Sequence, residues 1–211
     1  MNIIDKISDE LDRHEKKYKF ASLVVCGGNS VLNIFKGLSL KEINWKNIVV
    51  TLVDDRLVPE DHEDSNQSLV KKNLLVNNAS KANFLPLNSK NMLCKNIKKP
   101  FTVMLLSMGR DGHFASIFPN MLDDKNVANA KGKPEILKTM PQGVTNHARI
   151  TMNLAMILES KSIYLLVHGK IKLKVFDLAR TNRDLPINRL LIAAPSNLII
   201  DRSKELLVSS Q

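Results

Sequence analysis

The sequence predicts an α/β fold in which one open, mainly parallel sheet is flanked by helices on both faces. Short apolar runs, typical of buried strands, alternate along the chain with segments of helical periodicity. The chain has 211 residues, of which 44% are apolar, so it suits one domain with a sizeable core. It contains neither an internal repeat nor a low-complexity linker. We therefore expect residues 1–211 to form a single domain.

The elements follow in order from the spacing of apolar residues. Continuous or alternating apolar runs predict strands at 21–26, 47–53, 101–107, 149–154, 163–167 and 198–200. Apolar residues spaced three or four apart predict helices at 3–17, 29–38, 65–76 and 170–179. Asn29 or Ser30 would cap the second helix. We expect residues 113–118 to form a short helical turn stopped by Pro119, and residues 120–147 to be a long, partly irregular surface segment.

Composition argues against several classes of protein. No segment approaches the ~18 to 20 unbroken apolar residues of a membrane helix, and the charged N-terminus does not resemble a signal peptide. Cys26 and Cys94 show no metal-like spacing and no disulfide framework. We expect a cytoplasmic protein without a membrane partner.

The formal net charge is +10, from 31 Lys and Arg against 21 Asp and Glu. Nucleic-acid binding and attraction of a small anionic substrate would both explain it. The lysines are scattered, without aromatic interleaving or zinc-finger spacing. This pattern disfavours a nucleic-acid partner and leaves a purely compositional origin open.

Glycines and charged residues follow the predicted strands, at the edge where open α/β sheets bind ligands. Four motifs at or near these strand ends resemble the 6-phosphogluconolactonase family, which belongs to the superfamily of glucosamine-6-phosphate deaminase. The motifs are Asp54-Asp55-Arg56-Leu57-Val58-Pro59 with Ser65-Asn66, residues 108–119 (MGRDGHFASIFP), Arg149-Ile150-Thr151, and Gly169 with Lys172. They resemble the family's D-E-R-x-V-P with Ser-Asn, G-x-D-G-H-x-A-S-L-F-P, R-I-T and G-x-x-K, in family order. The resemblance runs from about residue 20 to about residue 205.

This resemblance implies a Rossmann-like, sugar-phosphate-isomerase-like sheet and the hydrolysis of 6-phospho-D-glucono-1,5-lactone without a cofactor. The implied partner is a small phosphorylated sugar lactone, and the implied assembly a monomer or small homo-oligomer. Two departures stand out: Cys26-Gly27-Gly28-Asn29 replaces the family's Ser-Gly-Gly-Ser/Thr, and Asp55 replaces its glutamate. The N-terminus is also short against the family pattern.

His113 is the candidate catalytic residue. Lactone hydrolysis needs a base for water and an acid for the departing ring oxygen, and one imidazole can serve as both in turn. Asp111 would fix its tautomer, although Asp-Gly is also a common turn pair. Exposed N–H groups of Gly109 and Gly112 would bind the oxyanion. A histidine held in a turn by hydrogen bonds is the alternative.

Arg56 resembles the family's cleft arginine, which points at the substrate; the alternative is an ion pair with a neighbouring aspartate. Arg149 and Lys172 match positions that bind the sugar phosphate, unless they are solvated surface charges. Gly27 and Gly28, with Asn29 beside them, would bring backbone amides to the same phosphate. A simple tight turn is the alternative for this loop.

The other histidines, His14, His62, His147 and His168, have no metal-like spacing, so we expect no metal. Cys26 is more consistent with a small buried residue than with a nucleophile. Two other functions compete with lactonase. A glucosamine-6-phosphate deaminase or isomerase would read D-E-Y at residues 54–56 and would continue G-H-I-A-F-N-E-P from residue 112. A non-catalytic sugar-phosphate sensor would carry a DNA-binding module, for which there is no room.

Overall fold

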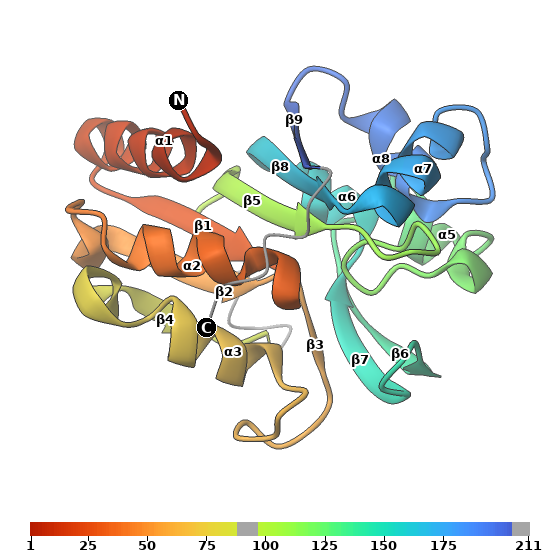
Figure 1. The fold of residues 1–211 in the computed structure, drawn as a ribbon, viewed down its shortest axis with the longest axis horizontal. Coiled ribbons are helices and arrows are strands. Elements are labelled where there is room, and N and C mark those ends of the chain that lie inside the picture. The colour runs from red at the N-terminus through yellow and green to blue at the C-terminus, as the bar shows by residue number, and fades with distance from the viewer. Residues whose placement is uncertain (88–96, 204–211) are drawn as a thin grey trace.

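The computed structural model describes residues 1–87 and 97–203, so Cys94 lies outside the described residues. At its centre is a six-stranded sheet with strand order β4-β2-β1-β5-β8-β9, in which all neighbouring strands are parallel (Figure 1). The strands are β1 (Ala21–Val25), β2 (Ile48–Leu52), β4 (Asn83–Leu85), β5 (Phe101–Ser107), β8 (Ser160–His168) and β9 (Leu198–Ser203). Helices flank this sheet, which confirms the predicted α/β fold.

The helices connect these strands and cover them. They are α1 (Ile3–Tyr18), α2 (Leu32–Ser39), α3 (Asn66–Asn73), α5 (Lys125–Ala128), α6 (Leu154–Leu158), α7 (Lys170–Ala179) and α8 (Pro186–Ala193). Helix α1 packs on β1 and β5, and α7 packs on β8. Within the described ranges, no helix is both long and apolar enough to cross a membrane.

The central strands form where the sequence is continuously apolar. Every residue of β1 and β2 is buried, as are the first six residues of β5. A parallel sheet covered on both faces requires such runs, because neither face meets water. The core of the protein therefore lies around these strands.

A second, antiparallel sheet of three strands stands beside the first, at the lower right of Figure 1. Its strands are β3 (Asp54–Arg56), β7 (His147–Met152) and β6 (Ile136–Gln142), with β7 in the middle. The sequence predicts residues 120–147 to be partly irregular, but it does not predict the strand β6 within them. Only two of the seven residues of β6 are buried, so its pairing with β7 leaves little apolar pattern in the sequence.

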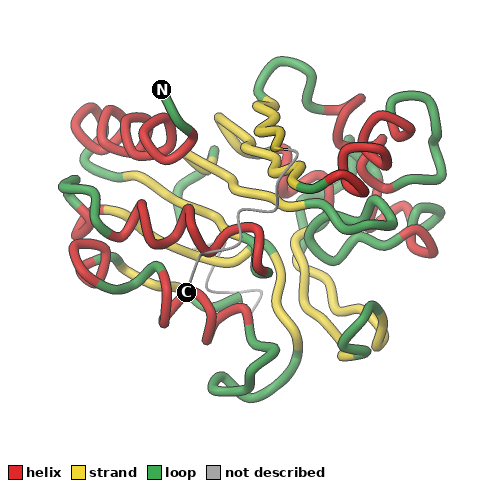
Figure 2. The backbone as a smooth tube through the Cα atoms, in the orientation of Figure 1, coloured by secondary structure: helices red, strands yellow, loops and turns green. Residues whose placement is uncertain are grey.

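Two local predictions are wrong. Residues 113–118 form turns and two isolated bridges instead of a helical turn, and Ala115 has a positive φ of 48°. In Figure 2 the stretch of chain that follows β5 is accordingly drawn as loop. Neither Asn29 nor Ser30 caps a helix. The chain passes from Gly28 into a 3₁₀ turn at Asn29–Val31 and then into α2, without a side-chain capping bond at either start.

The strand order reverses between β1 and β5. From β1 the chain proceeds to β2 on one side, whereas β5 and the later strand β8 lie on the other side. The carboxyl ends of strands at such a reversal open a crevice in which α/β proteins bind ligands. The loops after β1 and β5 are thus placed side by side.

Candidate active site

A cavity of about 520 Å³ lies at this reversal of strand order. It is lined from the loops after β1 and β5, from β3, from the β6–β7 hairpin and from the first turn of α7. All eight candidate residues line it: Gly27, Gly28, Asn29, Arg56, Asp111, His113, Arg149 and Lys172. The fold thus brings the candidate residues together, while their roles stay predictions.

The imidazole of His113 is held from two sides. Its Nδ1 lies 2.5 Å from Oδ1 of Asp111, and its ring stacks on Phe118 with centroids 4.6 Å apart. A carboxylate only accepts hydrogen bonds, so Nδ1 of a neutral imidazole carries the proton here. The other nitrogen, Nε2, then keeps a lone pair that can accept a proton.

Asp111 stays ionised beside this ring. Partial burial acts to raise the pKa of Asp111, but the hydrogen bond and charge of His113 outweigh burial and hold this pKa below its ordinary value. The carboxylate also accepts the backbone N–H of His113 at 3.3 Å. It therefore orients the ring and favours the imidazolium that forms when Nε2 takes a proton.

The glycines of this loop make room for the histidine. A Cβ at Gly109 would lie 2.2 Å from the His113 ring, so no side chain fits there. The amide of Gly109 donates to the His113 carbonyl at 2.8 Å, and the amide of Gly112 donates to the Gly109 carbonyl at 3.3 Å. Both N–H groups are thus used within the loop. Neither of these two amides is therefore free to bind an oxyanion.

Two arginines face each other across the β3–β7 ladder, where Arg56 pairs in register with Arg149. Arg56 donates from Nη1 to the carbonyl oxygen of Asp64 at 2.5 Å. Arg149 donates from Nε to the carbonyl oxygen of Gln142 at 3.2 Å and from Nη2 to Oγ1 of Thr145 at 3.3 Å. Burial, and then the positive charge of Arg56, lower the pKa of the Arg149 guanidinium.

Lys172 approaches the cavity from α7. Its Nζ donates to Oγ of Ser30 at 3.2 Å and to Oγ of Ser107 at 3.3 Å, so it joins the two loops that follow β1 and β5. Burial, together with the charge of Arg110, lowers the pKa of the Lys172 ammonium. Helix α7 begins after Gly169 without a side-chain cap, which leaves N–H groups available to an anion.

The three cations have no acidic partner. Within residues 1–87 and 97–203, neither Arg56, Arg149 nor Lys172 forms an ion pair with a carboxylate, so the alternative of an Arg56 pair with Asp54 or Asp55 is wrong. Nε of Arg56 is buried and has no hydrogen-bond partner. Grouping like charges at a partly buried site is costly unless an anion compensates them. Asp54 also lines the cavity, but no ion pair within the described residues joins it to any of the three cations.

The glycine turn after β1 is shaped by Asn66, a motif residue to which the sequence analysis assigned no role. A Cβ at Gly27 would lie 1.8 Å from Oδ1 of Asn66, the first residue of α3. Asn66 in turn donates from Nδ2 to the carbonyl oxygen of Asp54 at 2.9 Å. Gly28 has φ of 94°, which favours glycine. The Ser-Asn pair of the motif was the available signal for this contact.

The acidic residues before Arg56 serve the structure. Asp54 accepts a hydrogen bond from Oγ of Ser116 at 2.5 Å, which ties β3 to the histidine loop. Asp55 accepts the amides of Asn66 and Gln67 at the start of α3; burial raises the pKa of Asp55, and these amides oppose that rise. Cys26 is buried, and burial raises the pKa of its thiol to about 12, so it is not a thiolate nucleophile.

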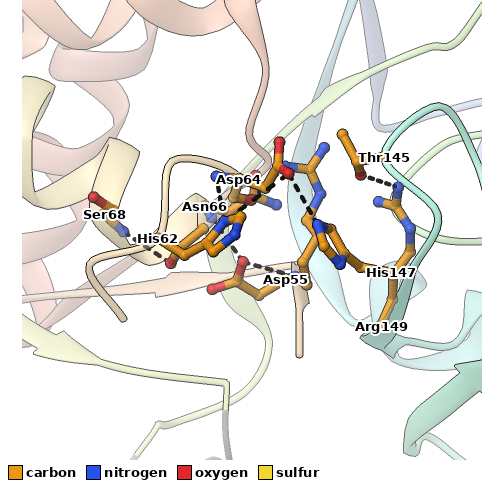
Figure 3. A network of polar contacts seen from close by, with 10 residues as sticks. Asp55, His62, Asp64, Asn66, Ser68, Thr145, His147 and Arg149 are labelled. Atoms are coloured by element: carbon orange, nitrogen blue, oxygen red, sulfur yellow. Dashed lines mark hydrogen bonds and ion pairs between the residues drawn. The ribbon is translucent and has the colours of Figure 1, made fainter. Parts of the chain in front are cut away.

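The fold also joins two histidines that sequence spacing did not connect. His62 and His147 both approach the carboxylate of Asp64 (Figure 3). They lie next to the paired residues Arg56 and Arg149, the arginine ladder, but are not among the residues that line the cavity. The hydrogen bond from His147, at 2.9 Å, lowers the pKa of Asp64.

Comparison with known proteins decides the family. Residues 1–200 match the family described as glucosamine-6-phosphate isomerases/6-phosphogluconolactonase. The chain belongs to this family. A 6-phosphogluconolactonase of Neisseria meningitidis serogroup A is 34% identical over 205 residues, covering 90% of this chain and 88% of the relative. One from Mesorhizobium japonicum is 34% identical over 202 residues, covering 90% and 84%.

Solved structures of this family have the same fold. The crystal structure of a 6-phosphogluconolactonase from Shewanella baltica superposes with a TM-score of 0.85 at 33% identity, covering 95% of this chain and 91% of the other. The structure of a putative 6-phosphogluconolactonase from Neisseria gonorrhoeae gives 0.82 at 32% identity, covering 95% and 93%.

Proposed function

We propose that the protein hydrolyses 6-phospho-D-glucono-1,5-lactone to 6-phospho-D-gluconate, the second step of the oxidative pentose phosphate pathway. One observation carries this proposal: a single cavity joins an imidazole held by a carboxylate to three cations that form no ion pair within residues 1–87 and 97–203. The first group suits proton transfer and the second suits a phosphate. The relatives named 6-phosphogluconolactonase support this choice of substrate.

In the first step, Nε2 of His113 takes a proton from water while the water oxygen attacks the lactone carbonyl carbon. The carbonyl π bond opens and leaves its electron pair on oxygen. Asp111 keeps the opposite nitrogen protonated and stabilises the imidazolium that results. Arg56, whose Nε lacks a partner, contacts the substrate on this side and compensates the developing negative charge.

In the second step, the carbonyl re-forms and the bond between that carbon and the ring oxygen breaks. The imidazolium returns its proton from Nε2 to the departing ring oxygen, which becomes the product hydroxyl. The new carboxylic acid then ionises. His113 ends in its starting state, so one histidine serves as base and then as acid. No metal or organic cofactor enters these steps.

The phosphate end of the substrate lies against the cationic part of the cavity. Arg149 offers a planar fork to phosphate oxygens, and Lys172 offers a point charge from the start of α7. The turn at Gly27, Gly28 and Asn29 adds backbone N–H groups at the start of the following 3₁₀ turn. We expect the enzyme to act in the cytoplasm, as a monomer or a small homo-oligomer, without nucleic acid.

The test is an assay of the purified protein on freshly prepared 6-phosphogluconolactone, with spontaneous hydrolysis subtracted. Acid release well above the spontaneous rate is the expected result. Glucosamine 6-phosphate serves as the second substrate in the same experiment. Ammonia release from it, without lactone hydrolysis, would replace lactonase by deaminase. Binding of either sugar phosphate without turnover would make the protein a sensor.

A further inference from the structure

Three side chains with metal-binding atoms meet beside the cavity, at one place on the surface (Figure 3). His62 and Asp64 lie in the loop 57–65 between β3 and α3, and His147 is the first residue of β7, 83 residues after Asp64. Their candidate ligand atoms all lie within 4.8 Å of one another. The three side chains are 27% to 36% exposed, so an ion from solvent has access to them.

Both imidazoles present a nitrogen to the same carboxylate oxygen. Nε2 of His147 lies 2.9 Å from Oδ2 of Asp64, and Nδ1 of His62 lies 3.9 Å from it. The backbone N–H of Asp64 donates to Nδ1 of His62 at 3.0 Å, so this nitrogen is unprotonated and its lone pair accepts that N–H. The two rings meet edge to face, with centroids 5.4 Å apart.

We propose that His62, Asp64 and His147 bind one divalent transition-metal ion, with zinc as the favoured ion. Two imidazoles and one carboxylate form a ligand set typical of zinc and its neighbours, whereas magnesium and calcium prefer oxygen ligands alone. Ligand atoms around tetrahedral zinc stand roughly 3.3 to 3.5 Å apart, from metal–ligand distances of about 2.0 to 2.2 Å. The observed separations lie on both sides of this value, so small side-chain rotations complete the site.

The ion would replace two existing contacts. It takes the place of the proton between His147 and Asp64, and it takes the His62 lone pair from the Asp64 amide. Water fills the remaining coordination positions, because protein supplies only three ligands. Coordination requires the ligating nitrogen of each imidazole to be unprotonated, so the proton on Nε2 of His147 moves to its Nδ1 or to solvent, and binding weakens in acid.

The position of the site gives it a structural consequence. The loop 57–65 also holds Arg56, through the carbonyl oxygen of Asp64, while Arg149 follows His147 by two residues on β7. A bound ion therefore clamps together the two segments that carry the arginine ladder. None of the three ligands lines the cavity, so the site is distinct from the proposed reaction centre.

Isothermal titration of chelator-treated full-length protein with zinc chloride, in a buffer without phosphate, tests this site. We expect the wild type to bind one equivalent. His147→Ala, Asp64→Asn and His62→Gln should each weaken the binding by at least about tenfold, the smallest loss seen when even an outer-sphere partner is removed. Asp64→Asn keeps the backbone carbonyl that Arg56 uses, so it changes the ligand and spares the ladder.

Two matched controls locate the ion. His14→Ala removes a partly exposed histidine elsewhere on the surface, and His113→Ala removes the histidine of the cavity. Both should bind zinc as the wild type does. Loss of binding in His113→Ala would overturn the proposal, because zinc would then sit at the His113–Asp111 pair. Absence of zinc binding by the wild type, or full binding by a His62→Gln/His147→Ala double variant, would overturn it as well.

A melting experiment provides a readout that does not depend on activity. Saturating zinc should raise the Tm of the wild type and of both controls, because the ion binds only the folded clamp. The same zinc concentration should raise the Tm of His147→Ala and of His62→Gln clearly less, because these variants bind the ion more weakly. An equal rise in Tm for all variants would contradict a site at these residues. Failure of the lactone assay would leave this experiment intact, since no substrate is involved.

Discussion

The histidine loop, residues 109–113, and the arginine ladder of β3 and β7 both line the cavity, yet they hold their functional side chains in opposite ways. His113 is paired with a carboxylate, and its loop closes on itself through backbone hydrogen bonds. Arg56 and Arg149 are held by carbonyl and hydroxyl oxygens, and neither has a carboxylate partner. A pair that is already neutralised suits proton transfer, while unneutralised cations suit the capture of an anion. We therefore propose that the loop carries the proton transfers and that Arg149 of the ladder binds the phosphate.

The largest effect is expected from the loop. His113→Ala should lower kcat/KM for the phosphorylated lactone by about 10²- to 10⁴-fold, the usual contribution of general acid–base catalysis, while leaving the fold intact. Steady-state kinetics beside a circular dichroism spectrum measure this. A folded variant with the wild-type rate would remove His113 from the reaction.

A smaller effect is expected when the ring is displaced instead of removed. Gly109→Ala would place a Cβ 2.2 Å from the imidazole, so the ring must move away from Asp111. Misplacement by about 1 Å can cost up to about 10²-fold, so kcat should fall at little change in KM. Gly132→Ala, whose Cβ would meet its nearest atom at 3.2 Å in a different loop, is the control and should keep its kcat. Equal kcat values for the two variants would contradict a rigid loop.

A substitution in the arginine ladder should change mainly KM. Arg149→Ala removes a charged contact worth about 1.5 to 3 kcal/mol, which corresponds to roughly 10- to 150-fold in KM for the phosphorylated lactone. Lys138→Ala removes an exposed charge from the same hairpin outside the cavity, and should leave KM within about twofold of the wild type. If Arg149→Ala lowers kcat at constant KM, the arginine acts in the chemistry and the comparison fails.

The rate of lactone hydrolysis should change gradually with pH, and we expect this change to come from the histidine loop. The pKa of Asp111 is lowered, so this carboxylate stays ionised from pH 5 to 8, and the thiol of Cys26, with a pKa of about 12, stays neutral. Histidine is the side chain that ordinarily titrates in this range. The rate should therefore fall as pH drops from 8 to 5. The unphosphorylated lactone is the right substrate here, because a phosphate also titrates near pH 6. A flat profile would argue against an imidazole base.

Much of this fold was predictable because the central strands carry their own signal. Continuous apolar runs predicted β1, β2, β5 and β8 to within a few residues, since a covered parallel strand must be apolar throughout. By contrast, β3 reads Asp54-Asp55-Arg56, and it becomes a strand only because β7 pairs with it. Helices α5, α6 and α8 were not predicted; α5 and α6 have only four and five residues, too few to show a helical period.

In the candidate site, too, some features were predictable from the sequence and others were not. Each of the four matched motifs places at least one residue in the cavity. The loops after β1, β5 and β8 converge there because parallel strands end at one edge of the sheet. Contacts between segments distant in sequence were not predictable. Asn66 beneath Gly27, and His62 and Asp64 beside His147, depend on how the second sheet docks against α3 and its loop. The bonding of the Gly109 and Gly112 amides likewise follows from the turn geometry of the loop, which a sequence pattern does not specify.

The roles proposed for the histidine loop and for Arg149 of the arginine ladder are tested most directly by measuring kcat/KM for two lactones with two variants. The lactones are 6-phosphogluconolactone and unphosphorylated gluconolactone, and the variants are His113→Ala and Arg149→Ala. We predict that His113→Ala loses the same factor on both substrates, since both need the same proton transfers. Arg149→Ala should lose roughly 10- to 150-fold on the phosphorylated lactone and almost nothing on the other. Equal losses on both lactones in Arg149→Ala would contradict the assignment of binding to the ladder.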